Sequence, residues 1–419
     1  MVREVLTLET RELKLGVTSS RLSSVRSRSE RETAVRVYDD GRVGTASGVG
    51  DVSVDALTDQ ARDALSLGIP YAPLPGAERA LSASHSGAEM GLSDLRELTE
   101  SLLVRLRELY PKLVLSEGVS HTRRAFSLRN DQGLDLSYDL SNTAAVFLVK
   151  ERGSANIIDS FAFAEGTELT LETALADIRS KLDKHDELAP APRGRTRVIF
   201  ASTAPHAGGA LLQLFERGCL ARPYATGSSI FSGRIGDTSR PFHPAFRLVD
   251  ARDPAGGRVC PFDAEGVVRT DLGLSLDLDL VRDGALRNVA TDKRDALRFG
   301  LPATGSATGP LEALPISGFS SLTVAPTAPT LAHLLDGEEG VLVWMSAGGD
   351  VTATGDIALP AQVAFRLSPD GAITHRLEGA IFTGNLFEVF GEGFIGSSEE
   401  TVTPRSDDRW LAAYMMAQG

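Results

Sequence analysis

The chain has 419 residues, of which 42% are hydrophobic and 24% are charged, and its formal net charge is −13. This length and composition are typical of a soluble globular protein with two or three domains, and the acidic balance makes nucleic acid a poor partner. The two cysteines, Cys219 and Cys260, give no disulfide framework and too few thiols for a cysteine-based metal site.

Two further features concern location in the cell. The first residues, 1–6, alternate charged and apolar side chains, unlike the apolar centre of a signal peptide. No run of about 18 apolar residues occurs, so the sequence predicts no membrane-spanning segment. We expect a cytoplasmic protein with no membrane partner.

The N-terminal part is predicted to combine antiparallel strands with helices. Polar and apolar residues alternate over residues 5–17, as they do in a strand. Residues 34–38 and 42–46 alternate in the same way around Asp39-Asp40-Gly41, and the Asp-Gly pair predicts a hairpin because glycine accepts the positive φ of the turn. Further strands are expected at residues 125–128, 134–138 and 144–149.

Helices are predicted between these strands. The first begins after Ser53, a favourable N-cap, and ends before Gly68. The second begins near Ser93, carries a stripe of leucines on one face, and ends at Pro111. A third covers Leu171–Leu182.

The charged, proline-rich stretch at residues 185–195 is interpreted as the main domain boundary. Beyond it the sequence predicts a strand at residues 197–200, a helix at residues 207–217, and then mostly strands and turns, with strands at residues 274–280, 341–344 and 361–367. The predicted fold class is α+β. An N-terminal α/β domain with antiparallel strands and two to three helices takes up residues 1–190, and a β-rich C-terminal domain takes up residues 191–419.

No local motif points to a nucleophile, a nucleotide site or a metal site. The seven histidines form no i, i+4 pair on a helix, and each is expected to be a surface or hydrogen-bonded side chain. A site assembled from scattered histidines and carboxylates stays open as a minor alternative. Residues 391–396 match the spacing GxGxxG, but a poor helix start with acidic residues follows, so a flexible glycine-rich loop is predicted there.

Two segments are candidates for contact with other molecules. Residues 222–231 are rich in small and hydroxyl side chains, and they fit a cleft or partner interface as well as an ordinary surface loop. The candidate residues in this segment are Arg222, Tyr224, Gly227, Ser228 and Ser229. The apolar tail at residues 409–416 is expected to pack on the body of the protein or on a partner subunit.

Several sequence blocks, taken in their order and spacing, resemble the TldD/PmbA family, and in particular its TldE (PmbA) branch. The blocks cover most of the chain and lie at residues 34–47, 227–229, 261–266, 281–284, 304–305, 354–356, 370–371 and 379–386. The resemblance implies a hydrolytic system of two subunits. TldD-like members carry a zinc site made of a His-Glu-x-x-x-His helix and a cysteine near the C-terminus, whereas TldE-like members lack this site and pair with TldD to form a peptidase that acts on extended or unstructured peptides.

The resemblance matches the zinc-binding helix of TldD-like proteins to the helix that begins at residue 207. It places Leu212 and Gln213 at the His-Glu pair and Arg217 near the second histidine, and no cysteine lies beyond Cys260. Zinc in proteins takes imidazole, thiolate or carboxylate ligands, and these positions offer none. The resemblance therefore implies no catalytic and no metal-binding residue in this chain, and it places the zinc in a TldD-like partner.

The leading hypothesis is a non-catalytic, TldE-like subunit of a heterodimeric TldD/TldE zinc metallopeptidase, inactive alone, that shapes a chamber for extended peptides. The alternative is a non-enzymatic binding or regulatory protein that acts as a homodimer, as the family's older description as a gyrase modulator suggests. An independent hydrolase that uses scattered carboxylates and histidines is the least supported hypothesis.

Overall fold

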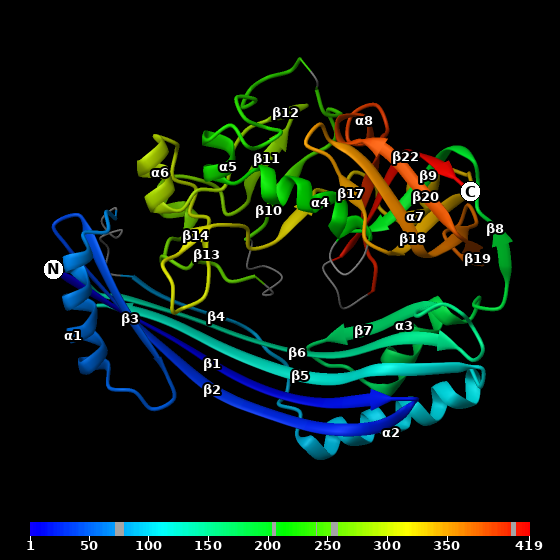
Figure 1. Cartoon of the computed structure of the whole chain (residues 1–419), viewed down its shortest axis with the longest axis horizontal. Helices are drawn as coiled ribbons and strands as arrows, with labels where there is room; N and C mark the ends of the chain where they lie inside the picture. The colour runs from blue at the N-terminus through cyan, green and yellow to red at the C-terminus, as the bar shows by residue number, and fades with distance from the viewer. Residues whose placement is uncertain (72–78, 203–206, 240, 253–258, 404–407) are drawn as a thin grey trace.

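The chain folds around two large β-sheets, which lie one above the other in Figure 1. The computed structural model describes residues 1–71, 79–202, 207–239, 241–252, 259–403 and 408–419. The lower sheet, called here the N-terminal sheet, has the strand order β3-β2-β1-β5-β6-β4, with β7 paired to β6. Its strands are β1 (Val2–Thr18), β2 (Arg21–Asp39), β3 (Arg42–Val49), β4 (Arg79–His85), β5 (Leu113–Asn130), β6 (Leu134–Glu151) and β7 (Ser160–Gly166).

Long antiparallel pairings build this sheet. β1 pairs with β2 from Val2↔Tyr38 to Thr18↔Arg21 and with β5 along its other side. The hairpin predicted from the Asp-Gly pair is confirmed, because β2 and β3 pair up to Asp39↔Arg42 and the turn between them has positive φ at Asp40 (47°) and Gly41 (69°). This turn matches the right-handed twist of the paired strands.

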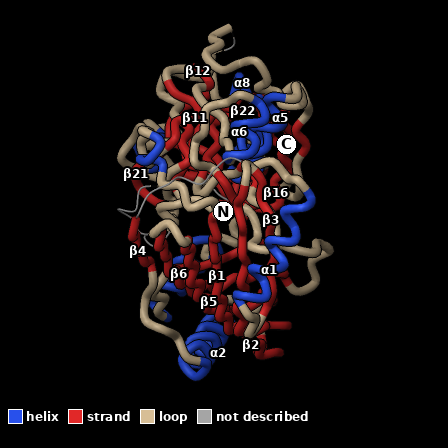
Figure 2. Tube along the Cα trace, turned by 90° about the vertical axis from the view of Figure 1, so that its left-hand side faces the viewer, coloured by secondary structure: helices blue, strands red, loops and turns tan. Residues whose placement is uncertain are grey.

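Helices cover one face of the N-terminal sheet at its two ends: α1 (Val54–Ala64), which continues as the short helix η1 (Leu65–Leu67), α2 (Leu92–Leu109) and α3 (Leu171–Leu182). Ser53 caps α1 as predicted, since its side chain accepts a hydrogen bond from the Ala56 N–H at 3.3 Å. The second helix begins at Leu92 with Gly91 as its N-cap, slightly before the predicted start at Ser93. Figure 2 shows α2 at the end of the molecule farthest from α5 and α8.

The upper sheet, called here the C-terminal sheet, has the order β16-β9-β22-β20-β18-β19-β8, with β17 paired to β18 and β21 paired to β22. Its strands are β8 (Leu188–Pro190), β9 (Gly194–Ala201), β16 (Gly340–Ser346), β17 (Asp350–Val351), β18 (Asp356–Leu367), β19 (Ile373–Glu378), β20 (Ala380–Asn385), β21 (Phe394–Thr401) and β22 (Arg409–Gln418). β22 pairs with both β9 and β20, so the apolar tail packs on the body of the protein as an internal strand.

Shorter elements surround the C-terminal sheet. The remaining strands are β10 (Leu248–Asp250), β11 (Leu278–Arg282), β12 (Ala285–Leu286), β13 (Ala307–Thr308), β14 (Ile316–Ser317) and β15 (Leu322–Val324). The remaining helices are α4 (Ala207–Gly218), α5 (Ala221–Ala225), α6 (Lys293–Phe299), α7 (Leu331–Leu335), α8 (Leu386–Val389) and the short helix η3 (Arg269–Leu272). The strand predicted at residues 274–280 is wrong in its first half, since β11 begins only at Leu278 after a turn that leaves η3 at Gly273.

The mixed α+β class with antiparallel sheets is therefore observed, and the division at residue 190 stays a prediction. The two sheets touch through aromatic side chains. The rings of Phe163 on β7 and Trp344 on β16 stack with centroids 5.5 Å apart, and the Trp344 indole N–H donates to the Phe161 carbonyl at 2.8 Å. Within the part of the chain that the structure describes, no helix is long and apolar enough to cross a membrane.

Candidate functional site

The helix compared above with a zinc-binding helix is α4, which packs against β9 and β16. Leu212 is buried in the hydrophobic core beside the C-terminal sheet, whereas Gln213 and Arg217 are exposed. Residues four apart share one face of a helix, so Gln213 and Arg217 are neighbours on the outer side of α4. The positions matched to the zinc-binding residues thus do not converge on one site.

The donor chemistry of these side chains does not fit zinc. Leucine has no ligand atom, the glutamine amide is a poor ligand, and a guanidinium carries only N–H donors. Across the described residues, no group of three or more His, Cys, Asp and Glu side chains could hold a metal ion. His206 lies outside the described residues.

The first candidate residues after α4 are Arg222 and Tyr224 on α5. The Arg222 guanidinium lies 3.3 Å from the Asp295 carboxylate on α6, and about half of its side chain is exposed. Tyr224 is partly buried against the core of the C-terminal half. α5 is therefore tied to α6 by one ion pair and to the core by one ring.

The next candidate residues form a turn that returns to the end of α4. Gly227 has a φ of 77°, which favours glycine, and a side chain there would meet open space. Ser229 Oγ donates to the Gly218 carbonyl at 2.6 Å and accepts the Phe231 N–H at 2.9 Å. Ser228 is exposed. The turn is held by its own hydrogen bonds, and its role as a chamber or partner loop stays a prediction.

A buried ion cluster, which the sequence analysis did not identify, joins the N-terminal sheet to the C-terminal half. It collects charged and phenolic side chains from β1, β2 and three distant segments of the chain. Its members are Glu4, Arg36, Tyr38, Tyr71, Asp263, Glu265 and Lys293. Two of the blocks that carry the family resemblance, at residues 34–47 and 261–266, meet in this cluster.

The contacts on the side of the N-terminal sheet centre on Glu4. Its carboxylate lies 3.4 Å from Arg36 Nη1 and accepts the Tyr38 hydroxyl at 3.1 Å, and both charged side chains are almost fully buried. Arg36 Nη1 also donates to the Ala264 carbonyl at 2.8 Å. This last hydrogen bond links strand β2 to the loop at residues 261–266.

The contacts on the other side centre on Glu265. Its carboxylate accepts hydrogen bonds from the Tyr71 hydroxyl and, at 3.0 Å, from the Lys293 backbone N–H. Asp263 Oδ1 accepts the N–H groups of Glu265 and Val267, each at 2.9 Å. These hydrogen bonds fold the loop onto the N-terminus of α6.

Burial shifts the pKa values in this cluster. Loss of solvation, with a smaller contribution from Asp263, raises the pKa of Glu265 to about 7, although Lys293 and Tyr71 act against the rise. Burial also raises the pKa of Glu4 and lowers the pKa of Lys293. Perturbed pKa values are typical of active sites and of structural ion networks alike. Here the Arg36–Ala264 hydrogen bond joins strand β2 to the loop at residues 261–266, so the arrangement is suited to holding the two halves together.

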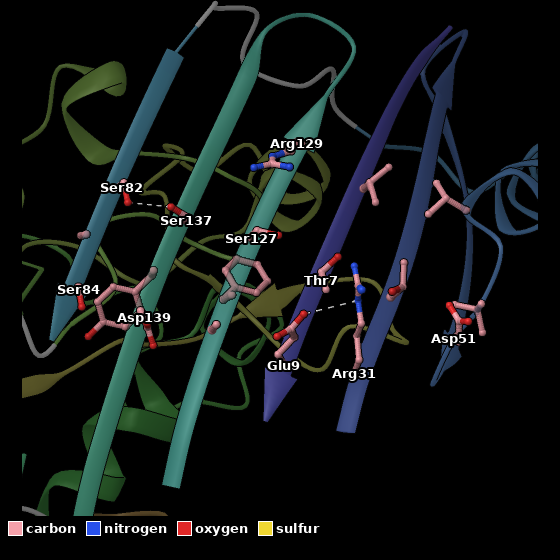
Figure 3. Close-up of a pocket in the computed structure, with 18 of the residues that line it drawn as sticks. Thr7, Glu9, Arg31, Asp51, Ser82, Ser84, Ser127, Arg129, Ser137 and Asp139 are labelled. Atoms are coloured by element: carbon pink, nitrogen blue, oxygen red, sulfur yellow. Dashed lines mark hydrogen bonds and ion pairs between the residues drawn. The ribbon is translucent and has the colours of Figure 1, made fainter. Parts of the chain in front are cut away.

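A separate hollow of about 710 Å³ lies on the face of the N-terminal sheet, and Figure 3 shows it across β4, β6, β5, β1 and β2. Its walls carry hydroxyl groups and paired charges. Ser82 and Ser137 share a hydrogen bond of 2.9 Å, and Arg31 lies 3.8 Å from Glu9. The described lining residues include no histidine and no cysteine, so they offer polar contacts and no nucleophile–base pair.

The chain is similar in sequence to one protein family and in fold to several solved structures. A sequence profile described as "PmbA/TldA metallopeptidase C-terminal domain" matches residues 193–409. A comparison with curated proteins gives no match.

Three solved structures share the fold over the whole of this chain. TldE from Thermococcus kodakarensis has a TM-score of 0.76 at 18% identity, with 97% of that chain covered. A protein described as a candidate modulator of a DNA gyrase from Thermotoga maritima has a TM-score of 0.75 at 16% identity, with 96% covered. A similarly described protein from Bacteroides thetaiotaomicron has a TM-score of 0.73 at 15% identity, with 95% covered.

Proposed function

The chain belongs to the PmbA/TldD family, since the family profile matches more than half of it, and on that premise we propose that it is the non-catalytic, TldE-like subunit of a heterodimeric zinc metallopeptidase. The observation that carries the proposal is the chemistry of α4. Leu212 is in the core, and the outer face presents Gln213 and Arg217. A peptidase centre requires imidazole or carboxylate ligands and a base beside the metal, and these positions supply neither.

In this proposal a TldD-like partner holds the zinc, and the present chain completes the walls around it. Enclosing a metal centre excludes folded proteins and admits an extended polypeptide, whose free backbone groups can pair with the edge of a sheet. The fold likeness to TldE over the whole chain supports this role, and so does a structure organised around two large sheets.

The test is co-expression with a TldD-like protein. We expect a stable complex that contains about one zinc per heterodimer and cleaves an unfolded peptide, while the present chain alone does neither. As a matched control, replacing a histidine of the partner's His-Glu-x-x-x-His helix should remove the zinc and the activity but leave the complex intact. Stoichiometric zinc and peptide cleavage by the isolated chain would overturn the proposal.

The regulatory alternative gives a different result in the same experiment. Two of the structures with this fold are described as candidate modulators of a DNA gyrase, whereas the net charge of −13 here disfavours direct contact with DNA. A homodimer that recovers a topoisomerase, and that ignores the TldD-like protein, would favour this alternative.

A further inference from the structure

Part of strand β2 forms an open edge of the N-terminal sheet. β3 pairs with β2 only from Glu32↔Val49 to Asp39↔Arg42, whereas β2 begins at Arg21. Residues 21–31, called here the open edge, therefore pair with β1 on one side only. In Figure 1, β3 lies near α1 while β2 continues along the sheet toward α2. Most side chains of the open edge are exposed.

The direction of the backbone groups on this edge follows from one hydrogen bond. The Gly50 N–H donates to the Arg31 carbonyl at 2.8 Å, so the backbone groups of Arg31 point away from β1. Backbone directions alternate along a strand, and the groups of Ser29, Ser27 and Val25 therefore point the same way. No partner for these groups is found among residues that the structure describes. They form a template onto which another strand can pair.

Backbone features that usually block such an edge are missing from this one. The register between β1 and β2 is continuous from Ser24 to Tyr38, and the bulge lies only beyond Ser24. No proline occurs between residues 21 and 39. Ser27 and Ser29 are small, which leaves room for an approaching strand. Of the features that disfavour pairing at a sheet edge, the open edge has only charged side chains.

These charges are mostly positive, although the whole chain is acidic. The open edge contains four arginines and one glutamate, in a protein of net charge −13. Arg28 is paired with Glu30, and Arg31 lies near Glu9. Within the described residues, no acidic group pairs with Arg21 or Arg26, and Arg26 lies directly opposite Lys14 on β1.

The positive charge selects the occupant. A second copy of this chain that paired with the whole open edge in antiparallel fashion would place Arg26 opposite Arg26 and Arg21 opposite Arg31, and like charges at directly opposed positions destabilise a sheet. An acidic strand would instead oppose Arg26 and Arg28 favourably. We propose that the open edge binds an extended acidic segment of a second, different polypeptide, which adds to the N-terminal sheet as a further strand.

The test uses the full-length protein and a fluorescently labelled synthetic peptide of about eleven residues, the length of the open edge, in which glutamate alternates with threonine and valine. We expect saturable binding that weakens with added salt, and no binding of the same peptide with lysine in place of glutamate. Hydrogen exchange should show that the peptide protects the amides of Val25, Ser27 and Ser29.

Two pairs of variants separate the backbone from the charge. Ser27→Pro removes an outward N–H and should weaken binding about tenfold or more, whereas Ser27→Ala keeps the N–H and should bind as the parent does. Arg26→Glu should weaken the acidic peptide about tenfold and allow the lysine peptide to bind, whereas Arg282→Glu, on an exposed position of β11, should change neither.

Circular dichroism of each variant confirms that it is folded. Equal binding of the acidic peptide to the parent and to Ser27→Pro would overturn the proposal, as would absence of binding. Dimers of the parent chain that Ser27→Pro dissociates would show that the occupant is a second copy, which also overturns it. Binding at the open edge needs neither zinc nor a TldD-like subunit, so its failure is distinguishable from failure of the proposed function.

Discussion

Replacing Glu265 with glutamine should remove a pH dependence of stability that comes from the buried ion cluster. Glu265 is 1% exposed and its carboxyl group lies near Asp263, and both conditions disfavour the ionised form of this group. Glutamine resembles the protonated acid in shape and has no charge. It also keeps an oxygen that can accept the Lys293 backbone N–H, which now donates at 3.0 Å.

The magnitude follows from the pKa shift. The pKa of Glu265 rises from 4.5 to about 7 on folding, and one pKa unit corresponds to about 1.4 kcal/mol. A raised pKa means that the folded protein holds the proton more tightly than the unfolded chain does. The contribution of protonated Glu265 to the free energy of unfolding is therefore fully present below pH 4.5. It is lost as the pH rises through about 7, with a total loss of roughly 3 kcal/mol.

Urea unfolding followed by the fluorescence of Trp344 and Trp410 measures this effect. Near pH 4 the parent and Glu265→Gln should have similar free energies of unfolding, and near pH 8 the variant should be more stable by roughly 3 kcal/mol. Glu108→Gln, at a side chain that is 63% exposed on α2, is the matched control and should follow the parent. Parallel pH profiles of the parent and Glu265→Gln, or a parent that gains stability relative to the variant as the pH rises, would refute the reasoning.

Three other predictions concern changes at one or two residues. Arg36→Met leaves the buried Glu4 carboxylate without its cation and should lower the free energy of unfolding by about 3–5 kcal/mol. Adding Glu4→Gln should restore at least half of that loss. A loss under about 1 kcal/mol for Arg36→Met would contradict this prediction. Gln213→His combined with Arg217→His places two imidazoles on the outer face of α4. Zinc at about 100 times its Kd should then stabilise the double variant by about 2.7 kcal/mol and leave the stability of the parent unchanged. Thermal unfolding with and without zinc measures this difference. Gly218→Ala brings a Cβ within 2.6 Å of the Phe231 ring and should lower the free energy of unfolding, measured in urea, by about 1–3 kcal/mol. An unchanged free energy would show that the turn after α5 moves to make room for the added methyl group.

Local patterns in the sequence predicted the elements that local chemistry determines. The Asp39-Asp40-Gly41 turn, the Ser53 cap of α1 and the bounds of α3 (Leu171–Leu182) are all observed. The open edge was not predicted as a strand. Residues 21–31 are mostly serine and arginine with no apolar alternation, and they become a strand because β1 pairs with them along its length.

The buried ion cluster was also missed, for a related reason. Charged residues such as Glu4, Arg36 and Glu265 are read as exposed unless their partners are known, and these partners come from distant parts of the chain. A signal was present, because the blocks at residues 34–47 and 261–266 both carried the family resemblance. Contact between the two blocks depends on the packing of the two halves, which spacing along the chain does not encode.

The zinc content of the purified, full-length chain most directly tests the central claim, which is that this chain does not hold the catalytic zinc. Metal analysis after incubation with excess zinc and removal of the unbound ion should find far less than one equivalent, because α4 offers Leu212, Gln213 and Arg217 where ligands would be needed. One tightly held zinc per chain, with peptide cleavage that a chelator abolishes, would contradict the account.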